Sequence, residues 1–228
     1  MKYLKIMMFF LCLILTVSCK NKTEETKSNT LKAEVPSAEV PKEEKQLKES
    51  AKEIAERFKP KDAEIVHEVI QTKVWGKQDV IIVFYASRYI DDQSTTVPFE
   101  RQYVEGYLLI PDGTKNYKKV LIYKFEDDNV ETIIQSVFFA NADKDSEKEL
   151  IILTTCSHRL ELLYDGTEYY NYVFDNFDIN KIPKKMTYLS DISTSIYGGF
   201  EGDHEDGPSK ADFKTASDVK AELKKLGY

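Results

Sequence analysis

Residues 137–153, VFFANADKDSEKELIIL, place a short apolar run on each side of an acidic stretch. Short runs rich in β-branched and aromatic residues, bounded by polar residues, predict strands joined by a turn. The pattern recurs in both directions along the chain. It predicts strands over 79–86, 102–110, 118–126, 130–140, 149–155, 160–164 and 168–174.

Two of the predicted connections carry turn signals. Pro111-Asp112-Gly113-Thr114 combines a proline that presets φ with a glycine that accepts positive φ, and Asp165-Gly166 is typical of a tight hairpin. Short strands at roughly ten-residue spacing indicate an antiparallel β-sandwich, a barrel or a propeller-like meander. We therefore expect one mainly β domain over residues 61–228, with a minor helical part.

Helices are predicted at both ends of this domain. Over 43–60 the apolar residues Leu47, Ala51, Ile54 and Phe58 share one face, which predicts an amphipathic helix that Pro60 stops. Over 215–226, Thr215 and Asp218 have the spacing of a capping box at the start of a C-terminal helix.

The first 18 residues have the features of an export signal. Lys2 and Lys5 give a positive start, and the apolar run 6–15 is too short to span a bilayer as a helix. Thr16-Val17-Ser18-Cys19 resembles the lipobox of bacterial lipoproteins, with threonine where leucine is usual. The resemblance implies a signal peptide over 1–18, lipidation of Cys19, and anchoring to a lipid bilayer of the bacterial cell envelope, with the outer membrane as the expected location. An ordinary secretory signal and a plain transmembrane anchor are the alternatives.

Composition fits a tethered domain. Residues 20–42 are rich in Lys, Glu, Ser, Thr and Pro, so we expect a disordered tether after the lipidated cysteine, over 19–42 in all. The net charge of −7 becomes −9 when Lys2 and Lys5 are removed with the signal. An acidic surface disfavours nucleic acid and favours a basic envelope protein or a divalent cation as partner.

Oxygen-bearing side chains alternate in the acidic stretch, at Asn141, Asp143, Asp145, Glu147 and Glu149. Calcium binds six to eight oxygen ligands, which a tight acidic loop can supply. The segment resembles the short calcium loop of integrin-type FG-GAP repeats, with Asn141 where aspartate is usual and Ser146 where glycine is usual. The resemblance implies a structural Ca²⁺ site. The alternative is a charged turn without a metal.

Two further segments are candidates for partner binding. Strand alternation puts Tyr170, Tyr172 and Phe174 on one face, where exposed tyrosines would suit a saccharide or protein partner. The alternative is that the C-terminal helix covers these tyrosines. The glycine-flanked segment 198–207 is expected to be a solvated loop, with Glu201, Asp203 and Glu205 as a contact surface for a basic partner.

Catalytic residues do not stand out. Cys12 falls in the leader and Cys19 would carry lipid, so Cys156 remains without a disulfide partner. Cys156 and His158 could form a thiol–imidazole pair, but core packing of Cys156 is the simpler interpretation. We expect a non-enzymatic binding or structural lipoprotein. An inhibitor or immunity lipoprotein against a cell-wall hydrolase and an envelope hydrolase are the alternatives.

Overall fold

The computed structural model describes residues 49–92, 98–113, 115–127 and 131–228. Residues Leu47–Tyr228 form one compact unit, which is called the folded unit below. The predicted signal peptide, Cys19, the tether and residues 43–48 of the predicted N-terminal helix lie outside the described residues.

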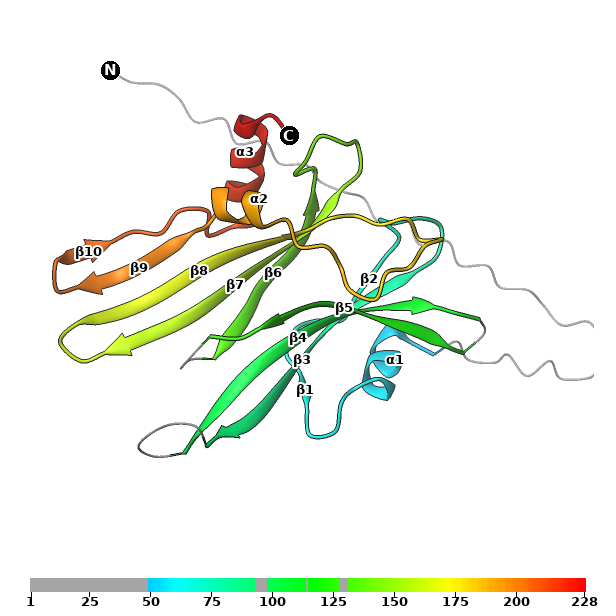
Figure 1. The fold of residues 1–228 in the computed structure, drawn as a ribbon, viewed down its shortest axis with the longest axis horizontal. Coiled ribbons are helices and arrows are strands. Elements are labelled where there is room, and N and C mark those ends of the chain that lie inside the picture. The colour runs from blue at the N-terminus through cyan, green and yellow to red at the C-terminus, as the bar shows by residue number, and fades with distance from the viewer. Residues whose placement is uncertain (1–48, 93–97, 114, 128–130) are drawn as a thin grey trace, which may run out of the picture. The chain divides into compact units, whose positions relative to one another are not determined.

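Ten strands in the described residues form two five-stranded antiparallel sheets (Figure 1). The first sheet has the order β1-β3-β4-β5, with β2 also paired to β3. It contains β1 (Glu64–Ile65), β2 (Ile70–Thr72), β3 (Val80–Asp91), β4 (Phe99–Pro111) and β5 (Tyr117–Phe125). The second sheet has the order β10-β9-β8-β7-β6. It contains β6 (Thr132–Ala140), β7 (Glu149–Leu160), β8 (Tyr164–Phe174), β9 (Gly199–His204) and β10 (Gly207–Ser209).

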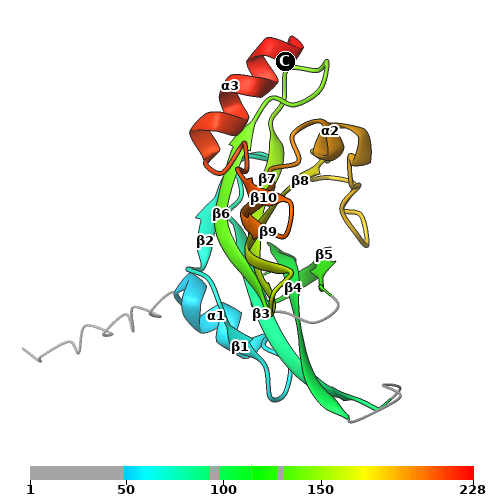
Figure 2. The ribbon, with the colours of Figure 1, turned by 90° about the vertical axis from the view of Figure 1, so that its left-hand side faces the viewer.

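A shared apolar core joins the two sheets. Ile82 and Phe84 of β3 pack in one cluster with Ile152 of β7 and Phe174 of β8, and all four side chains are fully buried. Since side chains alternate along a strand, Ile81 and Val83 point to the outer face of the first sheet. The predicted mainly β, antiparallel sandwich is confirmed (Figure 2).

Helices cover the outer faces of both sheets. Helix α1 (Ala51–Arg57) starts after Ser50, which forms a capping box with Glu53, and it buries Ile54 against β3. Helices α2 (Ser190–Ser195) and α3 (Ala216–Leu226) pack on the outer face of the second sheet. Thr215 and Asp218 form a capping box on α3. None of the helices in the described ranges is long and apolar enough to cross a membrane.

The sequence-based prediction was wrong at the β7–β8 connection. Asp165 and Gly166 lie inside β8, and the turn falls at 161–163, where Leu162 has a φ of 66°. Gly166 is paired with Gly202 of β9, and the two backbones lie very close together at this pair. A Cβ on Gly202 would collide with the carbonyl oxygen of Asp165. The segment 198–207, which was predicted to be a solvated loop, instead forms most of a hairpin of β9 and β10. Helix α2 was also not predicted.

Candidate functional site

The turn between β7 and β8 exposes a group of large apolar side chains. Leu162 is 93% exposed, and Leu160, Leu163 and Tyr164 are between 36% and 47% exposed. Scattered apolar residues are normal on protein surfaces, whereas large contiguous apolar patches are uncommon there. These four residues are called the apolar tip below.

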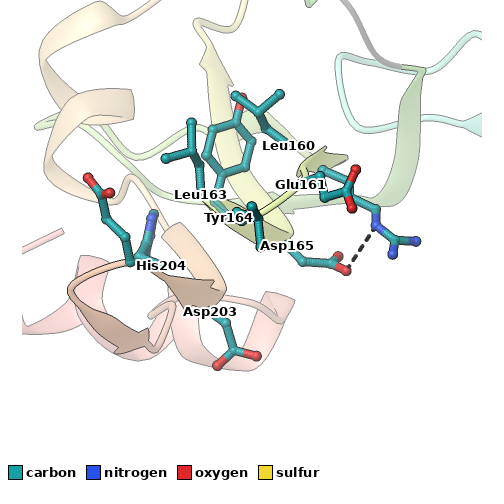
Figure 3. A pocket seen from close by; sticks show the side chains of 10 residues that line it. Leu160, Glu161, Leu163, Tyr164, Asp165, Asp203 and His204 are labelled. Atoms are coloured by element: carbon teal, nitrogen blue, oxygen red, sulfur yellow. Dashed lines mark ion pairs between the residues drawn. The ribbon is translucent and has the colours of Figure 1, made fainter.

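Acidic side chains surround the apolar tip (Figure 3). The backbone N–H of Glu205 donates to the carbonyl oxygen of Leu163 at 3.0 Å, which holds the β9–β10 turn beside the β7–β8 turn. A shallow depression of about 260 Å³ lies between the two turns. Five exposed carboxylates flank the tip, whereas the only positively charged group among the residues lining the depression is the guanidinium of Arg159. The carboxylates belong to Glu161, Asp165, Asp203, Glu205 and Asp206.

Leu162 is unfavourable for the stability of its own turn. Its φ of 66° lies in the left-handed region, which costs a leucine about 1–2 kcal/mol relative to the right-handed region. Its side chain is almost fully exposed, so burial within the chain does not offset this cost. Neither property stabilises the folded chain.

The predicted partner-binding residues divide into two groups. Asp203 and Glu205 lie beside the apolar tip, while Glu201 forms an ion pair with Lys214 at 2.7 Å. Tyr172 points between the sheets, with its ring 5.3 Å from that of Tyr123 and 5.0 Å from that of Phe125. Burial raises the pKa of the Tyr172 hydroxyl. Tyr170 lies next to Tyr172, and its ring packs 5.4 Å from that of Tyr197. Neither tyrosine belongs to the apolar tip.

The acidic stretch 141–149 forms the β6–β7 turn. Its side chains accept hydrogen bonds from backbone N–H groups two residues further along the chain. Asp143 accepts from Asp145 at 2.8 Å, and Asp145 accepts from Glu147 at 2.7 Å. Asn141 donates to the carbonyl oxygen of Asp145 at 3.0 Å. This network holds the turn.

Glu149 is the buried acidic residue of the stretch. Its Oε2 accepts a hydrogen bond from the N–H of Ala142, and burial raises the pKa of its carboxyl group. Oxygens of Asp143, Glu149 and Asp175 lie within 4.8 Å of one another, and this group is called the acidic cluster below. Asn176 adds amide donors to Asp145 and Glu149. The sequence analysis missed Asp175, which the pairing of Leu150 with Phe174 places opposite Glu149.

Cys156 and His158 lie on the same face of β7, but the thiol is not prepared for nucleophilic attack. Cys156 is buried, its Sγ lies 3.6 Å from Oγ1 of Thr132, and burial raises the pKa of the thiol to about 11. A catalytic cysteine needs the opposite shift, because the thiolate is the nucleophile. His158 faces the carboxylates of Asp127 and Glu168.

We therefore predict that Cys156 in the folded unit, where it is the sole cysteine, alkylates slowly. At pH 8 a thiol with a pKa of about 11 has roughly 100-fold less thiolate than an unperturbed cysteine, and burial slows its reaction further. Iodoacetamide labelling followed by mass spectrometry measures the rate. The unfolded unit in urea is the control and should react at the rate of free cysteine. Equal rates in the two states would contradict the prediction, because they would show an accessible thiol with an ordinary pKa.

Comparisons of the chain with protein-family models, with curated proteins and with solved structures gave no match. The fold alone defines the class: a two-sheet antiparallel β protein with helices on its outer faces. Its distinguishing surface feature is the apolar tip with its acidic surround.

Proposed function

We propose that this protein is a lipid-anchored module of the bacterial cell envelope that binds a basic protein through the apolar tip. The leader and Cys19 supply the anchor, and the sandwich presents the tip where β7 connects to β8. Labelling cells with a radioactive fatty acid tests the anchor. Label is expected on the wild-type chain and not on a Cys19→Ser variant, and an unlabelled wild-type chain would contradict lipidation.

The observation that carries the proposal is the exposure of Leu162 in a strained turn, within a group of large apolar side chains. Binding energy at protein interfaces is concentrated in a few central apolar or aromatic side chains surrounded by a polar rim. The apolar tip and its surrounding carboxylates have this arrangement.

The charge around the apolar tip selects the class of partner. The carboxylates of Glu161, Asp165 and Asp203 repel phosphate groups and attract a positively charged surface. This chemistry favours a basic protein with an apolar patch over nucleic acid or anionic lipid. A basic cell-wall hydrolase fits the same description, so inhibition of such an enzyme is the second candidate function.

Capture from envelope extracts tests the proposal. The folded unit is compared with two variants: Leu162→Asp, which places a charge at the tip, and Leu226→Asp, which changes a leucine of α3 that is 47% exposed. We expect a basic protein to bind the wild-type unit and the Leu226→Asp variant, and to be lost from the Leu162→Asp variant. Recovery of the same proteins with all three would contradict the proposal.

The acidic cluster is proposed to hold a structural Ca²⁺. The support is the proximity of three carboxylates, from Asp143, Glu149 and Asp175, whose mutual repulsion a divalent cation would relieve. Asn141 and Asp145 are positioned by the same turn and could contribute further oxygens. Glu147 lies outside the acidic cluster.

We predict that 1 mM Ca²⁺ raises the melting temperature of the folded unit by about 1–5 °C relative to chelator. A dissociation constant of about 10⁻⁴–10⁻³ M gives roughly 0.4–1.4 kcal/mol of stabilisation at this concentration, and each kcal/mol is worth about 2–4 °C in a domain of this size. Differential scanning calorimetry measures the shift. Asp143→Asn should abolish it, and Glu147→Gln should retain it. Identical melting temperatures with and without Ca²⁺ would leave the acidic stretch as a turn without a metal.

A further inference from the structure

A second group of metal-binding side chains lies between the two sheets. Asp127 follows β5 of the first sheet, whereas His158 and Glu168 lie on β7 and β8 of the second sheet. One ligand atom from each residue lies within 4.8 Å of the other two. This histidine and these two carboxylates are called the inter-sheet triad below.

The distances in the inter-sheet triad match those of a tetrahedral zinc site. Nε2 of His158 lies 3.2 Å from Oε2 of Glu168 and 3.8 Å from Oδ2 of Asp127. Zinc binds nitrogen and oxygen at about 2.0–2.2 Å, so two of its ligand atoms are about 3.4 Å apart in a tetrahedron. The two measured distances lie on either side of this value, and a small side-chain adjustment would satisfy both.

The imidazole nitrogen lacks a hydrogen bond in the described part of the structure. Nε2 of His158 is a buried atom, and although it is close to two carboxylates it has no hydrogen-bond partner. Buried polar atoms without partners are rare in folded proteins, and they often mark the position of a bound ion or water molecule. A metal ion placed between the nitrogen and the carboxylates would give Nε2 a ligand bond.

Glu168 is also oriented as a metal ligand. The hydroxyl of Tyr197 donates a hydrogen bond to Oε1 of Glu168, which leaves Oε2 facing His158. Ligating carboxylates in metal sites are themselves held by such outer hydrogen bonds. The side chains of the triad are only 19–22% exposed, so water solvates their charges poorly. A divalent cation would neutralise the charges of the two carboxylates.

We propose that the inter-sheet triad binds Zn²⁺ through Asp127, His158 and Glu168, with a fourth position open to water. A histidine nitrogen with two carboxylate oxygens is a donor set that zinc accepts, whereas Ca²⁺ requires six to eight oxygens. The bound ion would connect the end of β5 to β7 and β8 and so join the two sheets. This site is separate from the apolar tip and does not depend on the function proposed for the tip.

Isothermal titration of the folded unit with Zn²⁺ tests this proposal. The unit contains all three hydrophobic clusters and therefore carries its own core. We expect one zinc ion per chain, and a loss of affinity of about tenfold or more in both His158→Gln and Glu168→Gln, because each removes a ligand. His204→Gln is the matched control: it changes an exposed histidine beside the apolar tip and should bind as wild type does.

Asp127→Asn provides a variant outside the strands, so that loss of binding can be separated from loss of folding. Circular dichroism should show a native fold for this variant. The wild-type unit with Co²⁺ should show the visible absorption bands of a tetrahedrally coordinated ion, and the variant should not show them. Failure of the wild-type unit to bind one equivalent of Zn²⁺, or binding as tight as that of the wild type by both His158→Gln and Asp127→Asn, would overturn the proposal.

Discussion

Phe174→Ala is expected to lower the free energy of unfolding by about 3–5 kcal/mol, the range observed when a buried phenylalanine is truncated. The side chain of Phe174 is fully buried between the sheets, and its ring lies 5.8 Å from that of Tyr123 and 5.7 Å from that of Tyr188. Its removal leaves a cavity that neither sheet can close alone. Urea unfolding of the folded unit, followed by circular dichroism, measures the change.

Ile133→Ala is the control for this prediction. Ile133 lies on β6 with 53% of its surface exposed, and its truncation should change the unfolding free energy by no more than about 0.5 kcal/mol. Similar effects of the two substitutions would mean that the sheets do not share the core described above. The sandwich itself would then be in question.

Leu162→Asp is expected to weaken binding of the basic partner by about 2–4 kcal/mol, roughly 30- to 1,000-fold in Kd. The substitution removes the most exposed apolar side chain of the tip and buries a charge in the contact. Surface plasmon resonance with the captured partner measures the affinity. Asp203→Asn, at the edge of the tip, should mainly slow association and reduce its dependence on salt.

Leu162→Asn separates binding from folding. Asparagine tolerates the left-handed region better than leucine, so this variant should be more stable than the wild type by about 0.5–1 kcal/mol. Its affinity for the partner should nevertheless be lower than that of the wild type, because the apolar side chain is gone. A variant that is more stable but binds the partner less tightly would show that the leucine serves binding and not folding. Unchanged affinity in Leu162→Asn would contradict a role for Leu162 in the contact.

Local sequence patterns predicted most of the fold. The strands predicted over 79–86 and 149–155 correspond to the longer β3 (Val80–Asp91) and β7 (Glu149–Leu160), and the Thr215–Asp218 capping box placed the start of α3. The β9–β10 hairpin was missed because its glycines weaken a strand signal. Gly202 is required there by the close approach of β8, which is a contact between segments distant in sequence. The turn at Leu162 was missed because leucine is not a turn residue.

The candidate sites were predicted less completely than the fold. The alternation of acidic residues found Asp143 and Glu149, but Asp175 joins them only through the register of β7 and β8. Glu168 is likewise brought to His158 by the pairing of β7 with β8, and Asp127 is brought there by the packing of the two sheets. Charge alone indicated Asp203 and Glu205 as a contact surface. The apolar residues beside them were predicted as a strand over 160–164, and only the structure shows that they are exposed at a turn.

Site-specific photo-crosslinking tests the binding surface most directly. A photoreactive amino acid is placed at position 162 in the apolar tip, and in a separate chain at position 224, an exposed site on α3, which packs near the opposite end of β7. Irradiation of envelope extracts is expected to join a basic protein to position 162 and not to position 224. Crosslinking of the same proteins from both positions, or of no basic protein from position 162, would contradict the assignment of the tip as the binding surface.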